Sequence, residues 1–184
     1  ISARDYKTGA IYLAYTQEKS SMATALFVDY LLSSLQYYGI DPQSIVIQTD
    51  NGKEFTNPTD RKVTLFEKLV KEKYQATHFL IPYRRPTWNS DVESFHNLIE
   101  EEFFLSEKPN SEIDLLAKTF AYQIWFNSFR NNRGRNNQNL EQIFQSELNT
   151  KKPLPNIPPI LVDKYIQLIA KDNEVGYFLP LPPS

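Results

Sequence analysis

Apolar positions in the first 148 residues alternate between short continuous runs and longer stretches with helical spacing. The runs at 10–15, 44–49 and 76–81 are short and rich in strand-forming residues, and they predict β-strands. Apolar spacings of three and four residues predict helices over 22–38, 65–74, 91–104, 112–130 and 140–148. Strands that alternate with helices are typical of a layered α/β domain.

Local signals mark where two of these helices begin. Ser20 or Ser21 is expected to cap the first helix, and Thr64 with Glu67 forms a capping-box pattern at the second. Two prolines make regular structure improbable over residues 82–90.

The composition changes after residue 150. Residues 151–159 hold four prolines and are expected to form a linker. The chain would then divide into a domain over 1–150 and a C-terminal extension over 151–184. We expect the extension to begin with an amphipathic helix from residue 160, whose apolar residues need burial on the same domain or on a neighbouring subunit. Packing back on the same domain is favoured, because it needs no partner.

Composition excludes several classes of protein. The chain has 184 residues, of which 41% are hydrophobic, enough for one folded domain. It has no cysteine, which excludes disulfides and thiolate metal sites. A net charge of −2 is unlike a dedicated nucleic-acid binder, so any contact with nucleic acid must rest on local basic patches. No apolar run is long enough to span a bilayer.

An acid directly follows the apolar run at 44–49. Asp50 would lie at the carboxyl end of a strand, where open α/β sheets place their ligand sites. Asn51 and Gly52 predict a tight turn after it, because both residues tolerate positive φ. The alternative interpretation is a solvated acid in an ordinary turn.

A second acid lies in the first turn of a predicted helix. Glu93 follows the proline-containing segment, and Ser90 three residues earlier makes a helix-capping role the alternative. Two acids that converge from distant segments would provide the oxygen ligands that Mg²⁺ prefers.

These segments together resemble a known family. "IVIQTDNGKEFT" (45–56) and "PYRRPTWNSDVESFHNLIEEEF" (82–103) are similar to the catalytic core of the DDE integrase/transposase superfamily, of the bacterial insertion-sequence type with a retroviral-integrase-like core. Residues 125–144 are similar to the family's Tyr-Asn-x-x-Arg segment, with Phe126 in place of the tyrosine and Asn139 in place of a following proline. The resemblance covers about residues 1–148.

The resemblance implies an RNase H-like three-layer α/β fold, with a mixed central sheet flanked by helices. It implies DNA cleavage and joining by metal-dependent phosphoryl transfer, with two Mg²⁺ or Mn²⁺ ions. Asp50 and Glu93 would be the catalytic metal ligands, supported by Asn51, Gly52, Asn89 and His96. The implied partners are transposon ends and target DNA, bound by a homodimer or larger assembly. The implied location is the bacterial cytoplasm, near the nucleoid and without a membrane.

The family uses a third acid, on a strand that precedes the hairpin which residues 1–15 resemble. We therefore expect the first strand and the first catalytic Asp to lie upstream of this chain. Asp5 matches the hairpin acid of the family and is the alternative third ligand. With only two of the three acids, residues 1–184 are expected to bind metal weakly and to join little DNA.

Further residues are candidates for DNA contact. They are Lys53, Tyr83, Arg84, Arg85, Trp88, Arg130, Arg133 and Arg135. The pair Arg84 and Arg85 adjoins the acidic segment, and Tyr83 and Trp88 beside it could stack on an unpaired base. The alternative for each is ordinary packing or solvated charge.

The two histidines have different expected roles. His78 lies in a predicted strand and is expected to be structural. His96 lies one turn after Glu93 and would orient it or contact DNA.

Two other functions remain open on the sequence. One is a non-catalytic DNA-binding or assembly module, which the missing acid and the acidic composition favour. The other is an RNase H-fold nuclease that cuts DNA without joining it.

Overall fold

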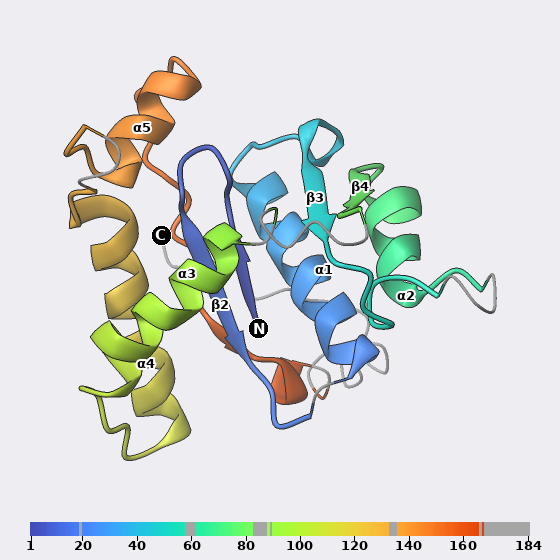
Figure 1. Cartoon of the computed structure of the whole chain (residues 1–184), viewed down its shortest axis with the longest axis horizontal. Helices are drawn as coiled ribbons and strands as arrows, with labels where there is room; N and C mark the ends of the chain where they lie inside the picture. The colour runs from blue at the N-terminus through green and yellow to red at the C-terminus, as the bar shows by residue number, and fades with distance from the viewer. Residues whose placement is uncertain are drawn as a thin grey trace.

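The protein is a mixed α/β structure (Figure 1). The computed structural model describes residues 1–18, 20–57, 62–82, 88, 90–132, 136–165 and 167. Its strands are β1 (Ser2–Arg4), β2 (Ile11–Tyr15), β3 (Val46–Thr49), β4 (Thr77–Leu80) and β5 (Ile160–Leu161). Its α-helices are α1 (Ser21–Tyr37), α2 (Leu65–Glu67), α3 (Ser90–Ile99), α4 (Glu112–Ile124) and α5 (Leu140–Glu147). The π-helical segments η2 (Lys68–Lys73), η4 (Glu100–Phe104) and η5 (Trp125–Phe129) continue α2, α3 and α4, and a 3₁₀ turn, η1 (Pro42–Ser44), precedes β3.

The described strands form two separate sheets. In the first, β1 and β2 are an antiparallel hairpin, and β5 runs parallel to β2 on its other edge. In the second, β3 and β4 are parallel, with Val46 opposite Thr77 and Thr49 opposite Leu80. Within the described residues, no strand pairs with the second edge of β1 or with the second edge of β3.

Strand β2 is buried between two helical layers, as Figure 1 shows. Tyr12 and Ala14 pack with residues of α1, whereas Ile11 and Leu13 pack with residues of α3, η4 and η5. Because side chains alternate along a strand, one five-residue strand supplies both cores.

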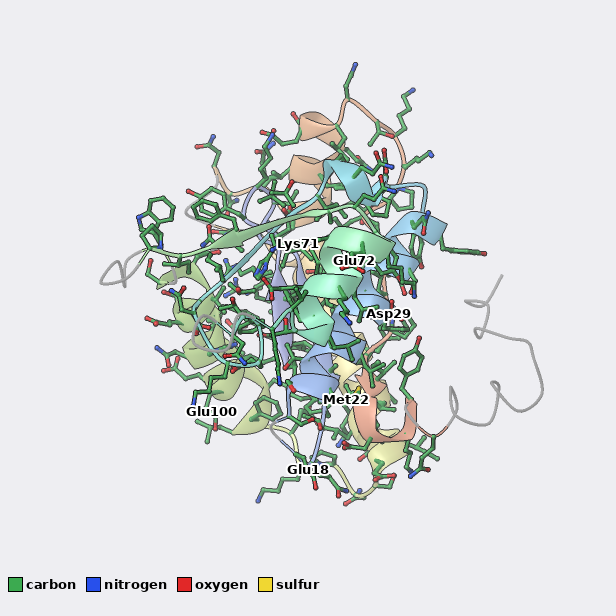
Figure 2. All side chains as sticks on the ribbon, turned by 90° about the vertical axis from the view of Figure 1, so that its right-hand side faces the viewer. Glu18, Met22, Asp29, Lys71, Glu72 and Glu100 are labelled. Atoms are coloured by element: carbon green, nitrogen blue, oxygen red, sulfur yellow. The ribbon has the colours of Figure 1, made fainter. Side chains whose placement is uncertain are left out.

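Helix α1 joins the two sheets. Phe27 and Leu31 pack in the core that contains β2, while Val28 and Leu32 pack in the core beneath β3 and α2. In Figure 2, Asp29 of α1 lies beside the segment that carries Lys71 and Glu72. Its carboxylate accepts hydrogen bonds from Lys73 Nζ at 2.6 Å and from Tyr74 Oη at 2.8 Å. The contacts of α1 therefore fix the second sheet relative to the first.

The helix starts agree with the local signals. Ser20 caps α1, where its Oγ accepts a hydrogen bond from the Ala23 amide at 3.1 Å. Thr64 and Glu67 form the reciprocal capping box at α2. None of the helices in the described ranges combines the length and the apolar character that a bilayer crossing requires.

The proline-containing segment after residue 150 lies in the main core rather than acting as a free linker. Leu154, Ile157 and Val162 are buried beside β2 and α1. Main-chain carbonyls along the segment accept hydrogen bonds from core side chains, with Gln123 Nε2 at 2.7 Å from Ile157 O and Tyr30 Oη at 2.9 Å from Pro158 O.

The helix expected from residue 160 is wrong at its start. Ile160 and Leu161 form β5 instead, opposite Ala14 and Tyr15. The open edge of β2 offers backbone hydrogen bonds at this point, and pairing with it overrides the helical spacing of the apolar residues. Helical geometry begins only at Val162.

Candidate active site

Asp50 is exposed and immediately follows β3. Its Oδ1 accepts a hydrogen bond from the Gly52 amide at 2.9 Å, which closes a local turn. The residue before it is buried, and the Thr49 hydroxyl lies 2.8 Å from Nε2 of His78 on β4. The contact between Thr49 and His78 thus fixes the end of β3, while the Asp50 carboxylate stays at the surface.

The turn after Asp50 differs from the expected one. Neither Asn51 nor Gly52 has a positive φ. Asn51 instead ties the turn to the neighbouring strand, because its Nδ2 donates to the carbonyl of Ile81 at 2.7 Å. A Cβ at Gly52 would lie 2.7 Å from Oε2 of Glu54 and 3.0 Å from Oδ1 of Asp50. A side chain at position 52 would clash with the carboxylates of Glu54 and Asp50. The φ of Gly52 is not positive and would itself allow a side chain.

Glu54 is therefore a candidate ligand that our sequence reasoning left out. Its carboxylate and that of Asp50 lie against the same point above Gly52. The signal was present in the Thr-Asp-Asn-Gly-x-Glu pattern, where Glu54 follows Asp50 by four residues.

Glu93 lies in the first turn of α3 and is exposed. The helix begins at Ser90, so Ser90 is a helical residue and not the cap that a capping box with Glu93 would need. Phe95 and Ile99 are buried and set the face of α3 that packs on the core. Glu93 consequently lies on the solvent side of the helix.

Two contacts join α3 to β1. Arg4 Nε is 2.9 Å from a carboxylate oxygen of Asp91, and the Ser2 hydroxyl is 2.7 Å from Nε2 of His96. Both partners on α3 flank Glu93 in the sequence. Burial, assisted by the nearby terminal amine, lowers the pKa of His96, and the negative charge of Glu93 acts in the opposite direction. Because His96 Nε2 is paired with the Ser2 hydroxyl, its orienting role toward Glu93 stays a prediction.

A further contact joins the segment before α3 to β3. Gln48 Nε2 donates a hydrogen bond to the carbonyl of Trp88 at 3.0 Å. Gln48 precedes Asp50 by two residues, and Trp88 precedes Ser90 by two. The hydrogen bond therefore links β3, which ends directly before Asp50, to Trp88, two residues before α3. Among the described residues, no three His, Asp or Glu side chains form a group that could hold a metal ion.

Asp5 is occupied within its own hairpin. Its Oδ2 accepts hydrogen bonds from the Thr8 amide at 2.9 Å and from the Thr8 hydroxyl. Gly9 follows with a φ of +84°, which completes the turn into β2. These contacts give Asp5 a structural role in the β1–β2 turn.

The residues predicted to contact DNA differ in their surroundings. Arg130 is paired with Glu102, with Nη2 2.7 Å from Oε1, and its guanidinium lies 5.1 Å from the centre of the Phe126 ring. This ion pair holds η5 against η4, and Glu102 offsets the positive charge that Arg130 would otherwise offer to a phosphate. Lys53 is exposed beside Asp50, and Trp88 is exposed beside β4. The other DNA-contact candidates lie outside the described residues: Tyr83, Arg84, Arg85, Arg133 and Arg135. Asn89, expected to support the catalytic acids, also lies outside them.

His78 has the structural surroundings that the sequence predicts. Besides Thr49, it contacts the Phe66 ring edge to face at 5.1 Å between ring centres. Burial lowers its pKa, and Lys71 lowers it further, while Glu67 acts in the opposite direction.

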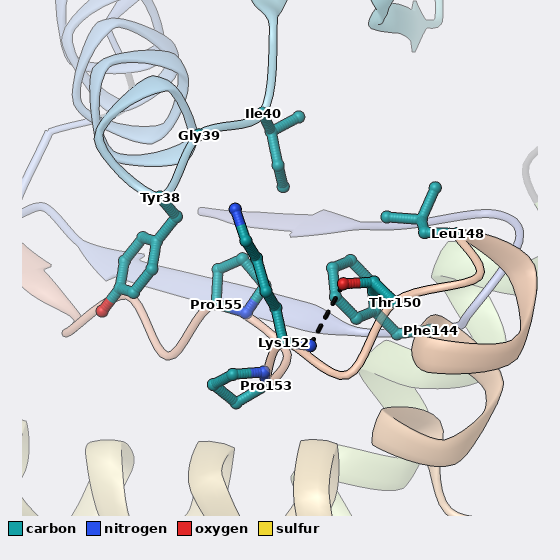
Figure 3. A pocket seen from close by; sticks show the side chains of 9 residues that line it. All are labelled: Tyr38, Gly39, Ile40, Phe144, Leu148, Thr150, Lys152, Pro153 and Pro155. Carbon is teal, nitrogen blue, oxygen red and sulfur yellow. Dashed lines mark hydrogen bonds between the residues drawn. The ribbon is translucent and has the colours of Figure 1, made fainter.

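A small surface hollow lies apart from all of these acids. Figure 3 shows Lys152 pointing its ammonium group toward Gly39 and Ile40 at the end of α1. The remaining walls come from α5 and the segment 150–155. None of the predicted site residues lines it.

Comparison with family models, with curated proteins and with solved structures finds no match for this chain.

Proposed function

We propose that the chain is part of a DDE-type polynucleotidyl transferase core, which cuts and joins DNA by metal-dependent phosphoryl transfer. The observation that carries the proposal is the link between Gln48 and Trp88. It ties Trp88, two residues before α3, to β3, which ends directly before Asp50. This contact supports a common site for the two acids of the sequence motifs, and both acids are exposed.

The arrangement of strands supports the RNase H-like interpretation of the fold. Helix α1 packs across both sheets, yet β1 and β3 do not pair with each other. One additional strand between them would join β2, β1, β3 and β4 into a single mixed sheet. The resemblance implies such a strand, and implies that it carries the third acid.

The proposed ligands suit a hard divalent cation by their chemistry. Asp50 and Glu93 offer only carboxylate oxygens, which Mg²⁺ and Mn²⁺ prefer. When bound, such ions activate a water or a 3′-hydroxyl and stabilise the leaving oxygen of the phosphodiester. Asp50 and Glu93 would hold the ions, and His96 would keep the Glu93 side chain oriented. Lys53 would contribute positive charge for a phosphate beside Asp50.

Paramagnetic Mn²⁺ tests whether the acids share a site. In ¹⁵N-labelled protein, Mn²⁺ should broaden the amide signals of Gly52 and Glu93 at the same concentration. Asp50→Asn or Glu93→Gln should weaken the broadening at both positions, whereas Glu112→Gln on α4 should leave it unchanged. Broadening at one position alone would show that the acids do not form one site and would refute the proposal.

The two other functions are separated by a DNA assay on the native gene product that contains residues 1–184. A polynucleotidyl transferase joins a 3′-hydroxyl end to target DNA in Mg²⁺ or Mn²⁺, a nuclease only cuts it, and an assembly module does neither. The commitment of Asp5 to its hairpin turn favours the assembly module for residues 1–184 taken alone.

A further inference from the structure

The hollow at the end of α1 has mostly apolar walls. They include the rings of Tyr38 and Phe144 and the side chains of Ile40 and Leu148. The Tyr38 hydroxyl already donates to the carbonyl of Asn156 at 3.2 Å, so this residue offers its ring to the hollow. The volume is about 190 Å³. An apolar cavity of about 150 Å³ holds one benzene molecule, so the hollow has room for one ring or a short branched chain.

A single cation stands among these walls. Of the nine described residues that line the hollow, Lys152 is the only charged one. Figure 3 shows its side chain between Tyr38 and Phe144, with the ammonium group toward Gly39 and Ile40. In the described part of the chain, that ammonium has no hydrogen-bond or ion-pair partner. Its three N–H donors are therefore open to a ligand.

The main chain of Lys152 is held in place without a ligand. Its amide donates to Thr150 Oγ1 at 3.1 Å, and its carbonyl accepts from Gln145 Nε2 at 3.4 Å. Gln145 belongs to α5, which the buried side chain of Phe144 anchors on the core. The base of the Lys152 side chain is thus already ordered, which lowers the entropic cost of binding. The Thr150 hydroxyl accepts this bond and keeps its own proton for a second contact.

The alternative role for Lys152 is to complement the negative end of α1. That helix has no basic residue in its last turn, and a Cβ on Gly39 would lie 3.7 Å from Lys152 Nζ. The helix end attracts the ammonium, but none of its carbonyls accepts a hydrogen bond from it among the described contacts. The same negative end disfavours a phosphate dianion beside it. A monoanion with an apolar body suits both the charge and the walls.

We propose that the hollow binds a small carboxylate that carries one aromatic ring or a short branched chain. The carboxylate pairs with Lys152, and the apolar body packs against Tyr38 and Phe144. This chemistry occurs in free organic acids and in the C-terminal residue of a protein chain. The site is independent of the proposed function, because none of the acids assigned to catalysis lines the hollow.

The experiment compares an acid with its neutral analogue. Phenylacetate and phenylacetamide are titrated separately into the ¹⁵N-labelled chain, with ionic strength held constant by sodium chloride. The readout is the movement of the amide signals of Gly39, Ile40, Thr150 and Lys152. The peptide acetyl-Gly-Gly-Phe, with a free or an amidated C-terminus, provides the same ring and carboxylate at the end of a chain.

Phenylacetate should shift these four signals saturably, with a Kd on the order of 1–10 mM, as its size allows. Phenylacetamide should bind roughly threefold to tenfold more weakly, because it lacks the charge that pairs with Lys152. Lys152→Met keeps the apolar stem and should remove the difference between acid and amide, whereas Lys152→Arg should retain it. The matched control is Lys151→Met, at an exposed neighbour that does not line the hollow, and it should retain the difference.

Equal affinity for acid and amide, or a preference for the acid that survives Lys152→Met, would overturn the inference. Reduced stability of Lys152→Met toward urea, without saturable shifts by phenylacetate in the parent, would show that Lys152 only complements α1 and would also overturn it. Tighter binding of the free-carboxylate peptide than of phenylacetate would support the inference with protein C-termini as the source. The reverse order would support it with free organic acids as the source.

Discussion

The side-chain amide of Asn127 takes the place of a β-strand partner for Ile11. The Ile11 amide donates to Asn127 Oδ1 at 3.0 Å, and Asn127 Nδ2 donates to the Ile11 carbonyl at 3.0 Å. One turn earlier, Gln123 Oε1 accepts from the Leu13 amide at 3.2 Å. Strand β5 pairs with β2 only at Ala14 and Tyr15, so these amides satisfy the rest of that edge inside the core.

Replacing Asn127 should therefore destabilise the fold. Asn127→Ala leaves the amide and carbonyl of Ile11 buried without partners, which should cost about 2–4 kcal/mol of unfolding free energy. Urea denaturation gives that value. The control is Asn97→Ala, at an exposed position on α3, where the change should stay within about 0.5 kcal/mol. Similar values for the two variants would contradict the structural role of Asn127.

The segment after residue 150 should contribute to stability as part of the domain. Ile157 is 2% exposed, so Ile157→Ala should lower the unfolding free energy by about 2–5 kcal/mol. Ile113→Ala removes the same atoms from a side chain that is 81% exposed and should have little effect. Deletion of residues 153–184 should reduce thermal stability sharply without changing the oligomeric state, which the solution mass reports. A dimer that became a monomer on deletion would show instead that the segment exchanges between subunits.

Asp5 should prove to be structural. Asp5→Ala removes the acceptor for Thr8 and should cost about 1–2 kcal/mol of unfolding free energy, as loss of a local side-chain cap does. Because its carboxylate is engaged in the hairpin, the same variant should leave Mn²⁺ broadening at Gly52 unchanged. Loss of that broadening with retained stability would identify Asp5 as a metal ligand.

Stability should fall on mild acidification. Burial lowers the pKa of His78 from its ordinary value of 6.5, so below about pH 6.5 the unfolded chain binds a proton that the folded chain resists. The contribution of neutral His78 to the unfolding free energy is fully present above pH 6.5, and it is lost as the pH falls through the lowered pKa of His78 in the folded state. Urea midpoints at pH 7.5 and 5.5 measure the loss, and His78→Gln should reduce the difference between them. His96, whose pKa burial also lowers, should account for part of the remaining pH dependence.

Residues 1–184 alone should join little DNA. The described residues contain no group of three acids that could hold a metal ion, and Asp5, the alternative third ligand, is held in its turn. Gel analysis of labelled oligonucleotide joining to plasmid in Mg²⁺ and in Mn²⁺ measures the activity. Robust joining by this chain, lost in Asp5→Ala, would show that Asp5 is the third ligand after all.

The sequence alone determined most elements and the candidate acids. Helix caps such as Ser20 and the Thr64–Glu67 capping box act between residues three apart, so they are readable from the local pattern. The acid after the strand at 46–49 and the acid in the first turn of α3 are also local features. They could be placed on their elements without knowledge of the fold.

Only the tertiary structure decided how those elements meet. Asn127 and Ile11 are 116 positions apart, and nothing near either residue indicates the pairing. The apolar spacing after residue 160 suggested a helix, but the unpaired end of β2 made a strand there instead. Arg130 could have faced DNA, yet Glu102 on η4 neutralises it. Each outcome depends on a partner brought close by packing, because buried polar groups and charges take the nearest available partner in space rather than in sequence.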